Sequence, residues 1–232
     1  MGALVGDAIA ARDGMDLVGR YDPAGGDGIT SDLDELEAAD VVVEFTRPDV
    51  VMDNLARWHH KNLHAVVGTS GFTPERIEEA RSLFGAGPPN CLIVPNFSIG
   101  AVLAMRFAAE AAPYFSAAEV IELHHDQKAD APSGTAIATA GRIAEASDQR
   151  RSVASNELIA GARGASVDGV PVHSVRLAGL LAHQEVILGG AGETLTIRHD
   201  TTDRSSFLPG VLMAVDRVAE LPGVTVGLEA LL

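Results

Sequence analysis

The residues best suited to chemistry lie in the segment 122–136, which reads ELHHDQKADAPSGTA. It contains the adjacent histidines His124 and His125 and then Lys128, one of only two lysines in the chain. An unperturbed histidine has a pKa of about 6.5, so its side chain suits proton transfer near neutral pH. The segment therefore combines candidate proton carriers with a cation.

The same segment ends at a predicted helix start, with Ser133, Gly134 and Thr135 in the first turn. Backbone N–H groups and hydroxyls at a helix N-terminus form a site for a carboxylate or a phosphate. Taken singly, Ser-Gly-Thr before a helix is usually only a cap, and paired histidines usually fill surface or core positions. Their combination in one short segment favours a site that binds an anion and moves a proton.

Strands and helices alternate through the N-terminal half of the chain. Apolar runs predict strands at 17–22, 41–45, 64–67 and 91–94, and helical patterns occupy 3–12, the stretch through Trp58 and the stretch from Thr73. Thr73 followed by Pro74 and Glu75 is typical of a helix start. This alternation indicates βαβ units around a parallel sheet.

The pattern changes from Val120 onward. A strand at 120–123 delivers the two histidines, and further strands are predicted at 170–179, 185–189 and 193–200 with little helix between them. Such a run indicates an antiparallel or mixed sheet. A final helix at 206–220 is expected to return to the first domain. We predict two domains, one over 1–98 and 204–232 and the other over 99–203.

Composition excludes several classes of protein. The formal net charge of −15 argues against a DNA or RNA partner, although a few local donors can still hold a small anion. Cys91, the single cysteine, lies in an apolar run and is expected to be a buried thiol. Neither a signal peptide nor a bilayer-spanning run is found, so we expect a soluble, cytoplasmic protein.

A metal site is not expected. His124 and His125 are neighbours on a strand and should point to opposite faces, and no carboxylate or cysteine stands at ligand-like spacing.

The pattern His-His-x-x-Lys-x-Asp-Ala-Pro-Ser-Gly-Thr-Ala resembles the signature of the dihydrodipicolinate reductase family. The similarity extends along nearly the whole chain, through 68–71, 95–98, 204–207 and the predicted strands, and is closest to actinobacterial members. It implies NAD(P)H-dependent reduction of 4-hydroxy-tetrahydrodipicolinate to tetrahydrodipicolinate, a step of lysine and diaminopimelate biosynthesis. The implied fold is a Rossmann-like dinucleotide-binding domain plus an α+β domain for substrate binding and tetramerisation, in a homotetramer.

The resemblance also implies roles for the segment 122–136. His124 is the expected general acid/base, and Lys128 is the expected proton donor and electrostatic partner. The cyclic dicarboxylate substrate is expected to contact His125, Lys128, Ser133, Gly134 and Thr135. This agrees with the anion site read from the residues themselves, because the substrate carries two carboxylates.

The cofactor, NADH or NADPH, is expected at the carboxyl ends of the first domain's strands, where open α/β sheets bind ligands. The residues implied by resemblance are Phe45, Thr46, Gly68, Thr69, Ser70, Val94, Pro95, Asn96, Phe97, Arg204 and Phe207. The family more often has threonine where Ser70 stands. Asp22, at the end of the predicted strand 17–22, is placed to accept hydrogen bonds from the ribose hydroxyls. A carboxylate there disfavours a 2′-phosphate and predicts a preference for NADH, which the nearby Arg20 can weaken.

One part of the pattern is missing. A dinucleotide-binding unit of this kind opens with a hydrophobic strand and a Gly-x-x-Gly-x-x-Gly turn. The sequence opens at Met1-Gly2-Ala3-Leu4, which resembles only the last glycine and the helix after it. Two explanations remain: a start placed too late, at an internal methionine, which we favour, or a truncated homologue with impaired cofactor binding.

Three function classes follow. The first is the reductase, and the second is a related two-domain NAD(P)-dependent dehydrogenase that acts on another small acid. The third is a non-catalytic remnant that binds a dicarboxylate or only assembles with partners. The pairing of His-His-x-x-Lys with Ser-Gly-Thr favours the first.

Overall fold

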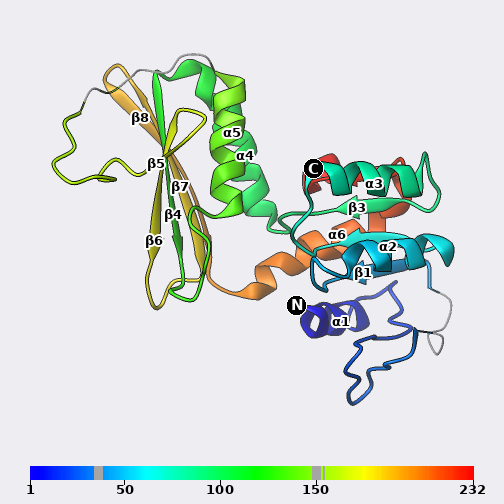
Figure 1. Cartoon of the computed structure of the whole chain (residues 1–232). Coiled ribbons are helices and arrows are strands. Elements are labelled where there is room, and N and C mark those ends of the chain that lie inside the picture. The colour runs from blue at the N-terminus through cyan, green and yellow to red at the C-terminus, as the bar shows by residue number, and fades with distance from the viewer. Residues whose placement is uncertain (34–38, 148–152, 154) are drawn as a thin grey trace. The chain divides into compact units, whose positions relative to one another are not determined.

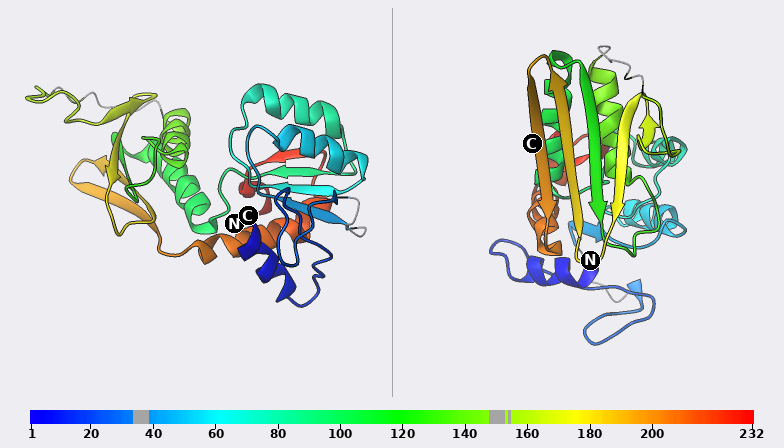
Figure 2. Two further views of the ribbon diagram at one scale, coloured as in Figure 1. Left: turned by 60° about the horizontal axis from the view of Figure 1, so that its bottom comes forward. Right: turned by 90° about the vertical axis from the view of Figure 1, so that its left-hand side faces the viewer.

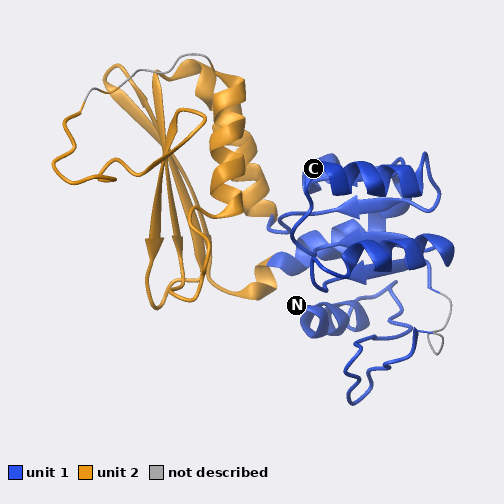
Figure 3. Ribbon diagram, viewed as in Figure 1, with its two compact units in different colours: residues 1–98, 207–232 blue, residues 99–206 orange. Residues whose placement is uncertain are grey.

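The computed structural model of the chain describes residues 1–33, 39–147, 153 and 155–232. These residues form two compact units (Figure 3). Unit 1 comprises Met1–Ser98 and Phe207–Leu232, and unit 2 comprises Ile99–Ser206. The C-terminal segment thus returns to unit 1 at Phe207, three residues after the boundary that we placed at 204.

Unit 1 is built on a four-stranded parallel sheet in the order β1–β2–β3–β9, so the expected parallel sheet is confirmed. Its strands are β1 (Val41–Glu44), β2 (His64–Val67), β3 (Cys91–Ile93) and β9 (Val224–Val226). Its helices are α1 (Gly2–Ala10), α2 (Val51–His60), α3 (Pro74–Phe84) and α6 (Leu208–Arg217). The sheet has helices on both faces, with α2 and α3 on one and α1 and α6 on the other (Figure 2, left).

The core of unit 1 explains why its strands read as continuous apolar runs. Both faces are covered, so Ala65, Val66 and Val67 of β2 are all fully buried. Cys91 is buried as expected, and burial raises the pKa of its thiol to about 12. At the start of α3, the Thr73 side chain accepts a hydrogen bond from the Arg76 N–H, as the predicted N-cap should.

The strand predicted at 17–22 is wrong. Within that segment the structure has only a single bridge, between Tyr21 and Thr30. The described strands give 17–22 no neighbour, since β1 is an edge of the sheet and pairs only with β2. An apolar pattern alone cannot make a strand, because the backbone N–H and C=O groups need a paired strand. The segment therefore runs as an irregular loop, with Val18 43% exposed.

Unit 2 contains a five-stranded mixed sheet in the order β5–β6–β4–β7–β8, which confirms the expected mixed sheet. Its strands are β4 (Ala117–His124), β5 (Ala165–Val167), β6 (Val170–Arg176), β7 (Ala182–Gly190) and β8 (Glu193–Thr201). The central strand β4 runs parallel to β6 and antiparallel to β7. Helices α4 (Ile99–Ala111) and α5 (Gly134–Ala146) lie on one face of this sheet (Figure 1).

Short 3₁₀ turns complete the described elements: η2 (Ala112–Tyr114), η3 (Arg204–Phe207), η4 (Val218–Glu220) and η5 (Leu228–Leu231). The helix predicted at 206–220 is therefore α6 with a 3₁₀ turn on either side. Strand β9, which has three residues and extends the parallel sheet beside β3, was not predicted from the sequence.

Candidate functional site

The face of the unit 2 sheet beneath the helices changes from apolar to polar along β4. Val120 lies between Val172 of β6 and Val186 of β7, and all three are buried. Because side chains alternate along a strand, the same face next presents Glu122 and then His124. The end of β4 thus carries its polar groups out of an apolar core toward the loop 125–133.

The start of α5 returns the chain to the same place. The Ser133 side chain caps the helix by accepting a hydrogen bond from the Ala136 N–H at 3.2 Å. The Ser133 N–H in turn donates to Oε1 of Glu122 at 3.2 Å. Ser133 is 3% exposed, so one buried carboxylate joins the strand that carries His124 to the helix start.

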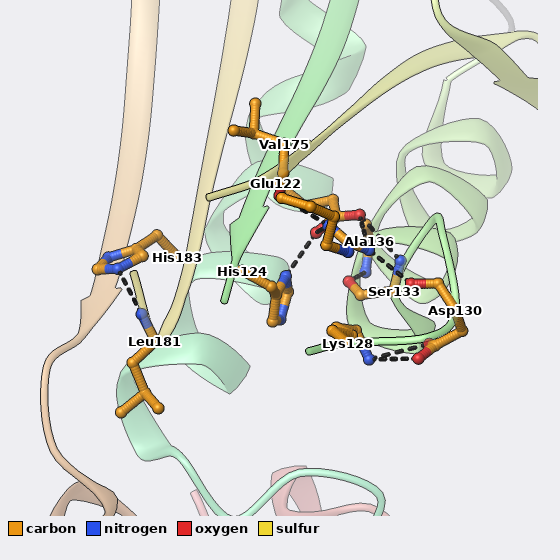
Figure 4. A network of polar contacts seen from close by, with 10 residues as sticks. Glu122, His124, Lys128, Asp130, Ser133, Ala136, Val175, Leu181 and His183 are labelled. Carbon is orange, nitrogen blue, oxygen red and sulfur yellow. Dashed lines mark hydrogen bonds and ion pairs between the residues drawn. The ribbon is translucent and has the colours of Figure 1, made fainter. Parts of the chain in front are cut away.

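Glu122 is the centre of a polar cluster (Figure 4). Its carboxylate is 0% exposed and accepts two hydrogen bonds from the Arg176 guanidinium, at 2.8 and 2.9 Å. Nδ1 of His124 lies 2.5 Å from Oε2 of the same carboxylate. Arg176 also donates to the Asp130 carbonyl at 2.6 Å, which ties the loop to β6.

The protonation of this cluster follows from its surroundings. Burial alone raises the pKa of Glu122, but hydrogen bonds from Arg176, Ser174 and His124 outweigh it, so the pKa is lowered and the carboxylate stays ionised. Burial lowers the pKa of His124 below its usual value, and Glu122 opposes this change. Neutral His124 beside an ionised carboxylate can accept a proton and then return it.

Lys128 lies in the loop beside this cluster. Its ammonium donates to both oxygens of the Asp130 carboxylate, at 2.8 and 2.9 Å. This hydrogen bonding by Lys128 lowers the pKa of Asp130. Asp130 is exposed, so an incoming ligand carboxylate can compete with it for the cation.

The remaining residues expected to bind substrate also lie here. His125 follows β4 directly, and its N–H donates to the Leu181 carbonyl at 3.4 Å. Gly134 and Thr135 form the first turn of α5. A methyl group added to Gly134 would meet no atom within 4 Å, so space is open beside this turn. The residues expected to contact substrate thus lie directly after β4, in the loop that follows and in the first turn of α5.

The residues expected to bind cofactor gather mainly along one edge of the unit 1 sheet. Because β1, β2 and β3 are parallel, the segments that follow them share an edge. The Thr46 N–H donates to the Thr69 hydroxyl at 2.9 Å, and the rings of Phe45 and Phe97 lie 5.5 Å apart. A side chain at Gly68 would come within 2.1 Å of the Phe45 ring, so this packing requires glycine. Also in these segments are Ser70, Val94, Pro95 and Asn96.

Three expected cofactor residues lie outside that edge. Asp22 lies in the irregular loop, where its carboxylate accepts from the Ala24 N–H at 2.9 Å. Arg204 and Phe207 begin and end the turn η3, and the boundary between the units separates them.

Sequence reasoning gave no role to Glu122, Arg176 or Asp130. For Glu122 a signal existed, because a carboxylate two positions before a histidine on a strand shares its face. For Arg176 none existed, since its pairing depends on the register of β6 beside β4.

The described residues also limit which other kinds of site the chain can hold. They contain no group of three or more His, Cys, Asp or Glu side chains that could hold a metal ion. No helix in the described part of the chain is long and apolar enough to cross a membrane. A cavity of about 410 Å³ lies toward the other end of β4, lined by Glu119, Arg163 and their neighbours.

Comparisons with known proteins cover the whole chain. Residues 1–97 match the family model described as dihydrodipicolinate reductase, N-terminus, and residues 100–232 match the model of its C-terminus. A 4-hydroxy-tetrahydrodipicolinate reductase of Mycobacterium ulcerans is 60% identical over 196 residues, covering 83% of this chain and 80% of the relative. The protein of that name from Mycolicibacterium vanbaalenii is 53% identical over 238 residues, covering 100% of this chain and 94% of the relative.

A solved structure gives the same result. The dipicolinate-bound dihydrodipicolinate reductase from Paenisporosarcina sp. TG-14 is 38% identical and superposes with a TM-score of 0.86. The match covers 100% of this chain and 95% of the other.

Proposed function

The chain belongs to the dihydrodipicolinate reductase family, and from this premise we propose which of its side chains carry the reaction. The function is NAD(P)H-dependent reduction of 4-hydroxy-tetrahydrodipicolinate to tetrahydrodipicolinate, in lysine and diaminopimelate biosynthesis. Neither the comparisons nor the described residues favour the non-catalytic alternative. The observation that carries the site assignment is the bonding of one buried carboxylate, Glu122, to both His124 and the helix start at Ser133.

The residues at the edge of the unit 1 sheet fit a nicotinamide cofactor. Gly68 packs against the Phe45 ring, and Thr69 and Ser70 follow it at the edge where open α/β sheets bind ligands. Asn96 and Phe97 follow the next strand at the same edge. When bound there, the reduced nicotinamide supplies a hydride to the substrate ring, which loses its hydroxyl as water.

The substrate is a cyclic dicarboxylate, and unit 2 supplies what such a ligand needs. One substrate carboxylate is proposed to bind at the first turn of α5, against Ser133, Gly134 and Thr135, where the helix dipole favours an anion. Lys128 then exchanges Asp130 for a substrate carboxylate, and His125 contributes a further polar contact.

Proton balance assigns His124 its role. Replacing a hydroxyl by hydride with release of water consumes one proton, so a proton donor must lie beside the ring. His124 is proposed as the general acid/base, since its ring lies at the end of β4 and its Nδ1 is held by the Glu122 carboxylate. Lys128 is proposed to stabilise the negative charge and to assist the proton transfer.

A steady-state assay tests this function. Oxidation of NADH and of NADPH is measured with 4-hydroxy-tetrahydrodipicolinate and with a panel of other small acids. We expect turnover only with the first substrate. We also propose that Asp22, although it lies in a loop and not at a strand end, accepts hydrogen bonds from the ribose hydroxyls and so gives a higher kcat/KM with NADH. A strong preference for NADPH would refute the role of Asp22, and turnover of another acid would refute the substrate.

Two further proposals concern the whole protein. We propose a homotetramer assembled through the unit 2 sheet, and light scattering that gives the mass of a monomer would refute it. Cytoplasmic localisation remains a prediction, which fractionation of cells that express the protein can test.

A further inference from the structure

The carboxylate of Glu122 contacts further groups besides its ion-pair partner Arg176. Oε1 accepts from Arg176 at 2.8 Å and from the Ser133 N–H at 3.2 Å. Oε2 accepts from Arg176 at 2.9 Å and lies 2.5 Å from Nδ1 of His124. Ser174 of β6 also donates a hydrogen bond to this carboxylate. Replacing the glutamate therefore disturbs the contacts to β6, to His124 and to the start of α5 at once.

The bond to His124 has a chemical consequence. An ionised carboxylate can only accept hydrogen bonds, so Nδ1 of His124 must carry the proton in this contact. In neutral imidazole the other nitrogen, Nε2, is then an acceptor. The carboxylate thus fixes both the ring orientation and the tautomer.

We propose that Glu122 is a positioning residue that holds His124 as the Nδ1–H tautomer, with Nε2 free to take up and deliver the catalytic proton. The same carboxylate, through the Ser133 N–H, fixes how far the histidine lies from the anion site at the start of α5. This inference rests on the proposed role of His124 as the general acid/base.

Arg176 lets this carboxylate stay ionised in a buried position. A carboxylate that is 0% exposed requires a compensating charge, and the guanidinium supplies it with two parallel hydrogen bonds. Arg176 also bonds the Asp130 carbonyl, so the loop that carries Lys128 is held by the same pair.

The charged groups around His124 come from three elements. Glu122 lies on its own strand, Arg176 lies on β6, and Lys128 lies in the following loop. The residue opposite His124 on β7 is Ala182, which has no charge. Of these groups only Glu122 stabilises the protonated imidazole, so its neutralisation should make His124 harder to protonate.

The direct test measures the tautomer in the unaltered protein. Nitrogen-15 NMR of labelled histidine distinguishes protonated from unprotonated ring nitrogens, and the variant His124→Asn assigns the resonances. We expect Nδ1 protonated and Nε2 unprotonated at a pH where His124 is neutral. The opposite tautomer would overturn the proposal, whether or not His124 is catalytic.

Glu122→Gln then tests the cause. In this variant the amide oxygen should take the position of Oε1, because that position faces two donors, Arg176 and the Ser133 N–H. The amide nitrogen then takes the position of Oε2, which faces Arg176 and His124. The amide NH₂ then faces Nδ1 of His124 and donates to it, which moves the ring proton to Nε2. We expect a reversed tautomer, a kcat lower by about 10²-fold or more with a smaller change in KM, and a pH profile moved to lower pH.

Glu119→Gln is the matched control, because Glu119 lies on the same strand and also bonds a histidine and an arginine. We expect it to leave the His124 tautomer and the pH profile unchanged. A reversal of the tautomer in Glu119→Gln, or an unchanged tautomer in folded Glu122→Gln, would overturn the proposal. If His124→Asn keeps full activity, the proposed function of His124 fails instead, and the NMR result still decides the role of Glu122.

Discussion

Strand β4 carries two glutamates that each bond one histidine and one arginine, on opposite faces of the same sheet. Glu122 bonds His124 and Arg176 beneath the helices and is 0% exposed. Glu119 bonds His173 and Arg163 on the other face, and its side chain is 34% exposed. Residue types are the same in both clusters, and their environments differ.

The difference shows that burial, and not the residue set, decides what such a cluster can do. In the Glu119 cluster, where the side chains of Arg163, Glu119 and His173 are 37%, 34% and 27% exposed, water partly screens each charge, and a pair of this kind contributes about 1 kcal/mol or less. In the buried cluster the same charges interact strongly, and removing one partner destabilises the fold because it leaves a buried charge without its counterion. In the second setting burial lowers the pKa of His124, and the carboxylate proposed to hold its tautomer is 0% exposed, which suits catalysis.

Replacing the histidine of each cluster should give the largest difference between the two clusters, measured as kcat. His124→Asn removes the proposed general acid/base and is expected to lower kcat by about 10² to 10⁴-fold. His173→Asn removes the equivalent group and should change kcat by less than about twofold, because His173 lies on the opposite face of the sheet from the proposed site. Steady-state oxidation of NADH measures both. Equal losses would show that the comparison fails for catalysis.

Replacing the arginine of each cluster tests how much each ion pair contributes to the free energy of unfolding. Arg176→Met leaves Glu122 buried without its countercharge, which should cost about 3–5 kcal/mol of unfolding free energy. Arg163→Met should cost at most about 1 kcal/mol. Equilibrium urea denaturation gives both values.

A double variant, Glu122→Leu with Arg176→Met, provides the control. Replacing a buried ion pair by apolar groups is often neutral or stabilising, so much of the stability lost in Arg176→Met should return. Activity should not return, because the bond to His124 is still absent. Recovery of activity with stability would contradict the positioning role of Glu122.

How much of these clusters the sequence could predict depends on the distance between partners along the chain. His124, Lys128 and Ser133 lie within one segment, and both the strand and the helix cap that hold them were predicted correctly. Arg176 is 54 residues from Glu122, and only the pairing of β6 with β4 brings the two together. Local pattern cannot supply that register.

The same reasoning explains the error at 17–22. Apolar alternation predicts which residues can form a strand, but a strand exists only where a neighbour completes its hydrogen bonds. The parallel strands at 41–44, 64–67 and 91–93 have such neighbours and were predicted, whereas the described residues give 17–22 none.

The dependence of stability on pH sharpens the comparison further. Burial lowers the folded-state pKa of His124, so between that pKa and about 6.5 the unfolded chain binds more protons than the folded one. Stability is therefore fully present above pH 6.5 and falls as the pH decreases through the folded pKa, by up to about 1.4 kcal/mol per pH unit. Urea midpoints from pH 7.5 to 5.5 should show this slope.

His124→Asn should flatten that slope, and His199→Asn should flatten it as well, because burial also lowers the pKa of His199. An unchanged slope in both variants would mean that neither histidine is buried in neutral form.

Added salt should produce the smallest change in unfolding free energy. The size of this change depends directly on how exposed each ion pair is. In 1 M NaCl the screening length is about 3 Å, so the contribution of the partly exposed Glu119 pairs, about 1 kcal/mol, should decrease. The stability difference between the wild type and Glu119→Gln should therefore become smaller in urea titrations at high salt. Glu122 has no contact with solvent, so the difference for Glu122→Gln should persist. If both differences fell equally with salt, water would reach the Glu122 cluster in solution, and its carboxylate could not hold His124 in a single tautomer.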